Sequence, residues 1–318
     1  MAIDAYIVLY QFLALIRTRS GAHLSSREGR VTSHLVGLAF RTTRLITDYS
    51  IKPVFVFDGK PPQLKEKELE TRRTHKRKAE TEYREALKKG DLAKAWSKAV
   101  QTSRLTGDMV DDSKHLLDLL GIPWVQAPSE GEAQAAYMVQ KEDAWAANSR
   151  DYDALLFGAP RLVRYLTIQG QKWLPSKGRA KKLEPELITL KTMLNHHGIT
   201  REQLIDIAIL IGTDFNKGIK GIGPKTALKL VKKHTNLENL PNQVAEKLPQ
   251  HYLQVREIFQ KPQVTDDYKT EMTSLREEEL YSFLCDELSF SRERVRTLAN
   301  RLIKTENQKS LKDWFGGN

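Results

Sequence analysis

The chain has 318 residues and a formal net charge of +11 at pH 7, from 51 Lys and Arg against 40 Asp and Glu. This length supports a large hydrophobic core. The positive charge favours a phosphate-rich partner, although several classes of protein share it. The single cysteine, Cys285, excludes an intramolecular disulfide, and its apolar neighbours predict a core position in a protein of a reducing compartment. No apolar run approaches the ~20 residues that cross a bilayer, so no membrane contact is expected.

The first elements follow a strand, helix, strand order. Residues 2–16 and 53–57 are short apolar runs, and the second is bounded by Pro53 and by Asp58-Gly59, which is typical of a buried strand before a turn. Residues 32–49 lie between them and place apolar side chains at helical spacing. This order predicts an α/β fold with a parallel-type central sheet flanked by helices.

The charged segment from Lys60 to Arg104 differs from its surroundings. It holds 14 Lys or Arg and 7 Asp or Glu, so it carries +7 of the net charge of +11. Its residues favour helix and few of them are large and apolar. The segment is either a solvated helical hairpin or an insertion that grips nucleic acid, and the concentration of positive charge favours the second.

Further elements follow residue 120. Residues 122–126 form a strand candidate, and a helix is expected to open at Pro128-Ser129. Residues 150–158 (RDYDALLFG) are expected to supply another strand or strand end, and residues 187–190 and 204–212 are apolar segments.

Seven acidic residues lie at or near the ends of these elements. Ligands of open parallel sheets bind beyond the carboxyl ends of the strands. Carboxylates that converge there in a basic protein repel one another unless cations neutralise them, and Mg²⁺ prefers such oxygen ligands. The residues are Asp4, Asp58, Glu130, Glu132, Asp151, Asp153 and Asp214.

Each of these residues also has a plain structural interpretation. Ser129 and Glu132 have the spacing of a capping box, and Asp58-Gly59 fits a turn. Asp151 and Asp153 project to the same side if the backbone is extended. A haloacid-dehalogenase-type phosphatase also uses an Asp-x-Asp pair after a strand, but the downstream Thr of that family is missing here.

Four stretches resemble successive motifs of one family: VFVFDGKPPQLK from Val54, APSEGEAQAAY from Ala127, RDYDALLFG from Arg150 and IGTDFNKGIKGIGPKTAL from Ile211. They are similar to the archaeal and eukaryotic flap endonucleases, within the XPG-like structure-specific 5′-nucleases. The resemblance implies a PIN-like nuclease core that spans residues 1–305. It also implies two-metal hydrolysis of 5′ flaps and 5′ exonuclease activity, with all seven carboxylates as ligands of two Mg²⁺ ions, for which Mn²⁺ can substitute.

The resemblance also assigns the segments that would hold DNA. Residues 60–105 become a helical arch, and the family's catalytic basic pair at its base falls on Lys65 and Arg72, which share a helix face. Residues 204–234 resemble a helix-hairpin-helix type element, in which Gly221, Gly223 and Lys225 would hold duplex phosphates beside a monovalent cation. A solvated helix face and a glycine-rich helix junction are the respective alternatives.

Four further residues fall on positions that the family uses near the DNA junction. Tyr10 corresponds to a base-stacking position, and Arg17, Thr32 and Arg41 lie around a 3′-flap pocket in the family. Isolated Arg and Tyr residues on helices are more often surface or packing residues, so these assignments depend on the resemblance alone.

The C-terminal tail, residues 306–318, resembles the sliding-clamp (PCNA) interaction motif, with Gln308, Leu311, Trp314 and Phe315 at the required spacing. The chain opens later than most family members and lacks the basic tail of eukaryotic ones. A monomer in the archaeal cytoplasm is therefore expected, and a nuclear location if the source is eukaryotic. A catalytically impaired, clamp-tethered protein that binds DNA junctions is the alternative function.

Overall fold

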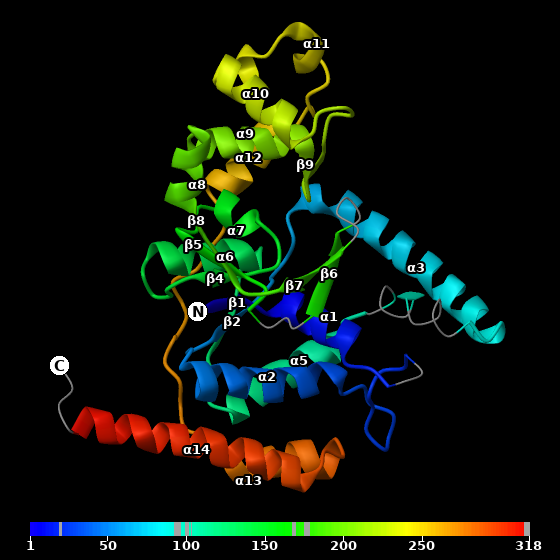
Figure 1. Ribbon diagram of the computed structural model, residues 1–318, viewed down its shortest axis with the longest axis vertical. Coiled ribbons are helices and arrows are strands. Elements are labelled where there is room, and N and C mark those ends of the chain that lie inside the picture. The colour runs from blue at the N-terminus through cyan, green and yellow to red at the C-terminus, as the bar shows by residue number, and fades with distance from the viewer. Residues whose placement is uncertain are drawn as a thin grey trace.

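The computed structural model describes residues 1–18, 21–91, 97–98, 102, 104–166, 170–174 and 179–314. A six-stranded sheet in the order β3-β2-β1-β4-β5-β8 lies at its centre (Figure 1). The first five strands of this order are parallel, and β8 pairs antiparallel with β5. This confirms the expected α/β fold with a parallel-type sheet. The strands are β1 Ala2–Asp4, β2 Val54–Phe57, β3 Trp124–Gln126, β4 Ala147–Asn148, β5 Arg161–Arg164 and β8 Glu186–Thr189.

Each face of the sheet is covered by its own hydrophobic core, because successive strand residues point to opposite faces. Ile3 and Phe55 belong to one core, whereas Ala2 and Val54 belong to the other. The first core packs against the helices in the lower part of Figure 1. These are α1 Ala5–Leu15, α2 Ser33–Tyr49, α5 Gly107–Leu119, α13 Glu277–Tyr281, the π-helical turn η4 Ser282–Glu287 and α14 Arg292–Trp314.

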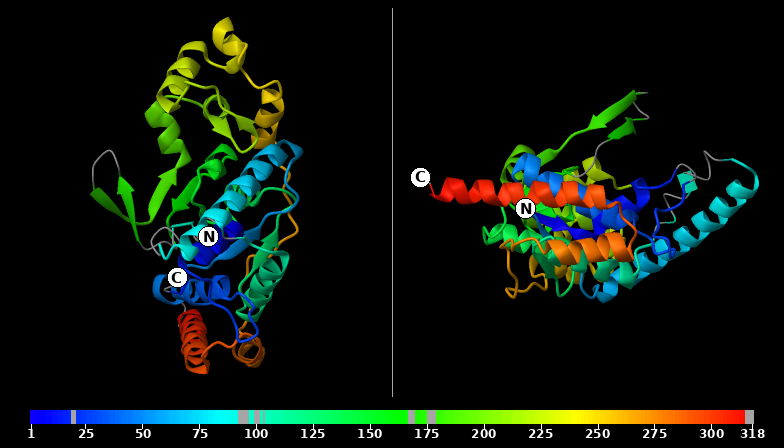
Figure 2. Two further views of the ribbon diagram at one scale, coloured as in Figure 1. Left: turned by 90° about the vertical axis from the view of Figure 1, so that its right-hand side faces the viewer. Right: turned by 90° about the horizontal axis from the view of Figure 1, so that it is seen from below.

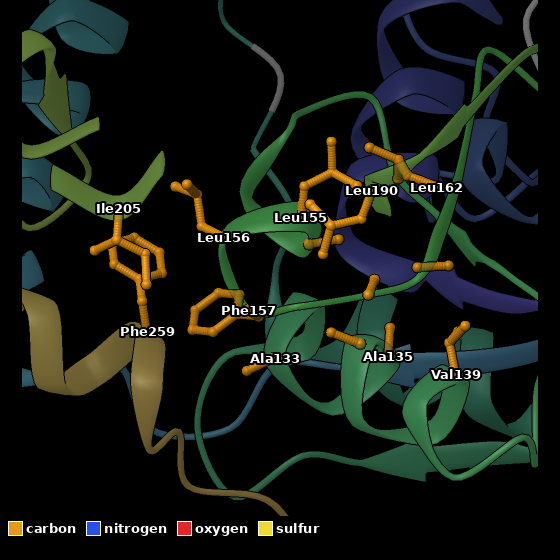
Figure 3. Close-up of a cluster of buried hydrophobic side chains, with 14 of the residues drawn as sticks. Ala133, Ala135, Val139, Leu155, Leu156, Phe157, Leu162, Leu190, Ile205 and Phe259 are labelled. Carbon is orange, nitrogen blue, oxygen red and sulfur yellow. The ribbon is translucent and has the colours of Figure 1, made fainter. Parts of the chain in front are cut away.

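The second core joins the sheet to an upper helical layer. Figure 3 shows Leu156 and Phe157 beside Ile205 and Phe259, and Leu155 beside Leu190. The rings of Phe157 and Phe259 have their centroids 4.9 Å apart. Burial of each such ring contributes about 1.5–3 kcal/mol, so this layer is fixed relative to the strand ends. Its helices are α6 Gly131–Gln140, α7 Asp153–Leu156, α8 Leu190–His197, α9 Arg201–Ile211, α10 Pro224–His234, η3 Leu237–Asn239, α11 Asn242–Ala245 and α12 Tyr252–Gln260.

Three segments extend from these layers. The turn η1 (Gln63–Lys65) leads into α3 (Glu66–Lys88), which projects from the body of the molecule (Figure 2). The strands β6 (Gly170–Leu174) and β7 (Arg179–Leu183) form one hairpin, and β9 (Gly212–Thr213) and β10 (Asn216–Lys217) form another between α9 and α10. The expected arch therefore begins with a long helix, and part of its return, residues 92–96, 99–101 and 103, lies outside the described residues.

The structure corrects two element predictions. The apolar run 2–16 is not one strand, because Asp4 ends β1 and caps the helix α1, which is buried on most sides. Residues 150–158 do not form a strand either, since a bend leads directly into α7. Cys285 packs against the first core but is only half-buried. Within the described ranges, no helix combines the length and apolar content needed to cross a bilayer.

Candidate active site

The carboxyl ends of β1 and β2 deliver the first two acidic side chains. Asp4 is the last residue of β1, and its Oδ1 accepts a hydrogen bond of 2.9 Å from the Ile7 N–H at the start of α1. Asp58 follows β2 directly, and its Oδ1 accepts a 2.6 Å bond from the Gly131 N–H. Because β1 and β2 are parallel neighbours, the two carboxylates emerge side by side.

The start of α6 brings Glu130 and Glu132 to the same edge. The expected capping box between Ser129 and Glu132 does not form: Glu130 occupies the N-cap position and no side chain caps the helix from there. Asp58, from the neighbouring strand, satisfies the Gly131 N–H instead. A Cβ at Gly131 would lie 2.7 Å from Asp58 Oδ1, so this close approach requires glycine. Since the helix starts after Glu130, Glu132 does not take part in capping and lines the pocket.

The remaining three carboxylates come from two loops. Asp151 and Asp153 follow β4, but their backbone is not extended, because Tyr152 has φ −102° and ψ −2° and Asp153 begins α7. The condition of extended backbone is therefore not met, although both side chains line the same pocket. Asp214 comes from the turn between β9 and β10. Its neighbour Phe215 packs on Phe259 with ring centroids 5.4 Å apart, which fixes the turn against the second core.

All seven predicted carboxylates line one pocket. Burial and then the charge of Asp58 raise the pKa of Asp4 well above its ordinary value. Burial, followed by the charges of Asp153 and Asp4, does the same to the pKa of Glu132. Burial and then the Asp214 charge raise the pKa of Asp153 to about 7. Ionisation of all these carboxylates together is therefore unfavourable unless cations bind to the site.

Two cations from the base of α3 already partly neutralise the pocket. Lys65 Nζ lies 2.5 Å from Glu130 Oε2 and 3.3 Å from Asp214 Oδ2. Arg72 Nη2 lies 2.7 Å from Asp214 Oδ1. Burial, the largest single effect, would lower the pKa of Lys65, but the charges of Glu130, Asp214 and Asp58 and the hydrogen bond to Glu130 together outweigh it, and the pKa rises. The predicted basic pair thus faces the predicted carboxylates.

The donor set fits divalent cations. Glu132 Oε1 is buried and has no hydrogen-bond partner within the described part of the chain. An unsatisfied buried carboxylate oxygen is costly, and Mg²⁺ or Mn²⁺ binds oxygens of this kind. As the side chains stand, no three acidic, His or Cys side chains of the described residues are arranged to share one ion. Lys65 lies between Glu130 and Asp214, so ion binding there requires its ammonium to move.

The predicted DNA-junction residues fall into two groups. Tyr10 lines the pocket, and Lys76 Nζ lies 4.5 Å from the centroid of its ring. Arg17 donates to the carbonyls of Ala14 and Gly21 and so holds the loop after α1. Two others lie on α2: Thr32 is buried at its start, and the Arg41 guanidinium lies 5.4 Å from the Phe12 ring centroid.

The glycines of the helix-hairpin-helix type element stand at an open helix start. Gly221 has φ +89°, a left-handed conformation that favours glycine. Gly223 is the N-cap of α10, and Pro224 follows at the first helical position. Among the described residues, no atom beyond the chain neighbours lies within 4 Å of a Cβ built at Gly221 or Gly223, and Lys225 is exposed, so this helix start is open.

The C-terminal motif is described only in part. The backbone of α14 remains helical through Trp314, beyond the predicted boundary at residue 306. The side chains of Gln308, Leu311 and Trp314, and the whole of Phe315, lie outside the described residues. The clamp motif therefore stays a prediction.

The sequence analysis missed several residues of the pocket. Tyr152 stands between Asp151 and Asp153 and lines the pocket, as do His23, Tyr83 and Arg84. The position of Tyr152 between two predicted ligands was a signal in the sequence. The other three come from the loop after α1 and from the outer part of α3, so only the fold brings them to the site.

A cluster of carboxylates at strand ends, most of them partly buried and faced by the cations of a basic segment, is the arrangement of a metal-dependent phosphodiesterase. Comparison with known proteins agrees with this class. The XPG N-terminal domain matches residues 1–80, and the XPG I-region matches residues 121–214.

Full-length relatives identify the family. The chain is 49% identical over 327 residues to Flap endonuclease 1 of Aeropyrum pernix, covering 99% of this chain and 93% of that protein. It is 51% identical over 310 residues to Flap endonuclease 1 of Hyperthermus butylicus, covering 96% and 87%. The solved structure of flap endonuclease-1 from Methanococcus jannaschii matches with a TM-score of 0.74 at 43% identity, covering 97% of this chain and 93% of that one. The chain belongs to the flap endonuclease family.

Proposed function

We propose that this protein is a divalent-metal-dependent flap endonuclease with 5′ exonuclease activity, which cleaves 5′ DNA flaps in replication and repair. The observation that carries the proposal is the meeting of seven carboxylates, from distant parts of the chain, in one pocket faced by Lys65 and Arg72. The family relationship supports the same activity.

The residues of the pocket have two roles in hydrolysis: some would hold the ions, and others stabilise charge on the phosphate. Bound in pairs about 4 Å apart, divalent ions activate water and stabilise the leaving oxygen. A phosphate in the pocket competes with Glu130 and Asp214 for Lys65 and Arg72, and these two cations then stabilise the charge that develops on the phosphate. The residues that would hold the ions are Asp4, Asp58, Glu130, Glu132, Asp151, Asp153 and Asp214.

The open start of α10 supports a duplex-binding site away from the pocket. Free N–H groups at a helix N-terminus bind phosphate, and Lys225 adds charge beside them. Contacts of this kind release counterions, so we propose binding that depends strongly on salt and weakly on base sequence.

The identity of the ions and the partners belongs to the same proposal. Two Mg²⁺ ions, replaceable by Mn²⁺, occupy the carboxylate pocket, and a monovalent cation binds the backbone around Gly221 and Gly223. The sequence motif supports docking of residues 306–318 on a sliding clamp. We further propose that the protein acts as a monomer in the cytoplasm of an archaeal cell, which the archaeal source of its relatives supports.

Cleavage of a labelled 5′-flap substrate tests the function. Wild-type protein should release the flap with Mg²⁺ and not with EDTA, and Asp153→Ala should lose cleavage while binding the flap with near wild-type affinity. Asp286→Asn, which changes an exposed ion pair with Arg292, is the matched control and should cleave normally. Tight binding without product at any Mg²⁺ concentration would instead support a junction-binding protein.

A further inference from the structure

Tyr152 is an exposed aromatic residue inside the catalytic pocket. It lies between the predicted ligands Asp151 and Asp153, lines the pocket and is 53% exposed. Single exposed aromatics are common and need no explanation by themselves. Tyr152 differs because Arg164 fixes the orientation of its ring. Its backbone also adopts the sparsely populated bridge conformation that recurs in active sites.

Arg164, at the carboxyl end of β5, holds the Tyr152 ring in place. The Arg164 side chain is nearly buried, at 9% exposed, and its guanidinium lies 4.0 Å from the centroid of the Tyr152 ring. Its Nη1 donates to the Tyr152 hydroxyl at 2.5 Å, and its Nε donates to the Arg150 carbonyl at 2.9 Å. The ring therefore cannot turn away without breaking bonds to a nearly buried cation.

A second tyrosine, Tyr165, contacts the other side of Arg164, and we call the three residues Tyr152, Arg164 and Tyr165 the clamp. Tyr165 has φ +59°, a left-handed conformation that is uncommon for a bulky residue. The guanidinium of Arg164 lies 4.6 Å from the Tyr165 ring centroid, and its Nη2 donates to the Tyr165 hydroxyl at 2.8 Å. Local strain of this kind persists where the surrounding structure maintains it, often at functional sites. Arg164 is thus stacked between two rings, of which only Tyr152 lines the pocket.

We infer that Tyr152 is a stacking platform for one unpaired nucleobase next to the cleaved phosphate. The inference rests on the proposed cleavage of DNA in this pocket. The carboxylates on both sides of Tyr152 would hold divalent ions, and a phosphate bound at these ions would bring a neighbouring base to the exposed part of the ring. Bases stack on aromatic side chains without regard to sequence, and a clamped ring loses little conformational entropy when they do so. Tyr10, elsewhere in the pocket, lies under Lys76 and is a separate platform.

The chain contains a matched control at the other end of β5. Trp145 is 55% exposed, the Arg161 guanidinium lies 5.3 Å from its ring centroid, and Arg161 Nε donates to the Trp145 carbonyl at 2.5 Å. Trp145 is thus another exposed aromatic residue next to an arginine. It precedes β4, and the arginine that contacts it stands at the amino end of β5; Trp145 is not part of the pocket lining.

A double-mutant cycle between protein and DNA tests the inference. Single-turnover cleavage is measured with an intact 5′-flap substrate and with two substrates that carry an abasic nucleotide on one or the other side of the cleaved bond. On the intact substrate, Tyr152→Ala should slow cleavage about 5- to 100-fold, the range for loss of one stacked base. On one abasic substrate, the same change should slow cleavage no more than about 2-fold, because no base remains to stack. Tyr152→Phe keeps the ring and should stay within about 3-fold of wild type on the intact substrate.

The other outcomes separate this inference from its alternatives. Trp145→Ala should match wild type on every substrate. An equal loss for Tyr152→Ala on all three substrates would mean that the residue acts through the neighbouring carboxylates, and no loss on any would mean that it has no role; either result overturns the inference. If wild-type protein cleaves no substrate at all, the proposed function itself fails, which is a distinguishable result. Tyr152→Ala should lower the midpoint of thermal unfolding slightly, because Arg164 loses its bond to the Tyr152 hydroxyl. Tyr152→Phe loses the same bond and controls for this effect on stability.

Discussion

The raised pKa of Asp153 predicts that the catalytic pocket destabilises the metal-free protein. Burial and the charges of Asp214 and Asp151 raise this pKa from 3.8 to about 7. In the unfolded chain the carboxyl ionises at its ordinary pKa. Between the two values the folded state therefore binds more protons than the unfolded state, and stability falls as pH rises. Above the folded pKa the full cost is about 4 kcal/mol, and it vanishes below the unfolded pKa.

Asp153→Asn removes this cost because the amide carries no charge. In EDTA at about pH 8 the variant should be more stable than wild type by up to ~4 kcal/mol, and by ~1–3 kcal/mol if neighbouring carboxyls share the protons. This corresponds to a rise of about 2–6 °C in the midpoint of thermal unfolding for a chain of this size. Below about pH 3 the two proteins should unfold at the same temperature, because Asp153 is then protonated in both states of the wild type.

Thermal unfolding in EDTA across this pH range is the assay, with Asp286→Asn as the control for a change of one exposed carboxylate. Added Mg²⁺ should stabilise wild type more than Asp153→Asn, because ions that bind the folded state alone raise stability by mass action. A variant less stable than wild type at about pH 8, or a gain that is the same at every pH, would refute the electrostatic reasoning.

Three further outcomes follow from the same structure. Lys65→Met leaves Glu130 without its cation, so it should slow flap cleavage at least about 100-fold and lower stability in EDTA by roughly 1–3 kcal/mol, as measured by single-turnover kinetics and denaturant unfolding. Arg256→Met leaves the buried Asp206 carboxylate unpaired and should cost about 3–5 kcal/mol in denaturant unfolding; its flap cleavage at low temperature should be unchanged, and a catalytic defect in the folded variant would contradict a purely structural role. Removal of residues 306–318 should spare cleavage of naked flap DNA and abolish stimulation by a sliding clamp, so stimulation that survives would place the clamp site elsewhere.

Local patterns predicted part of the sheet and one of its neighbouring helices, namely β2, β3 and α2, but not β4 or β5. Residues 54–57 and 33–49 fold as their periodicity indicates, because an isolated apolar run and an amphipathic stretch are each defined over a few residues. The prediction of a strand at residues 2–16 holds only for residues 2–4, because apolar residues on every side do not distinguish a strand from a buried helix. Only its position under the sheet, with Asp4 as the cap, makes residues 5–15 helical.

The candidate ligands were also visible in the sequence, because acidic residues that follow strand-like runs gather at one edge of a parallel sheet. The local contacts of each ligand, however, were not visible in the sequence. Glu132 is free of the capping box because α6 begins one residue later than the box requires, with Glu130 as its N-cap. Asp214 reaches the pocket because Phe215 packs on Phe259. Contacts between residues far apart in the chain leave no periodic signal.

The amino-acid sequence by itself determined the acidic chemistry of the site, the basic segment opposite it and the family, since these depend on residue types and on spacings within short motifs. The tertiary structure alone decided which carboxylates are buried without partners, where Lys65 and Arg72 point, and that Arg164 holds Tyr152 against the pocket. Those properties arise from burial and from long-range packing, and both exist only once distant segments of the chain have come together.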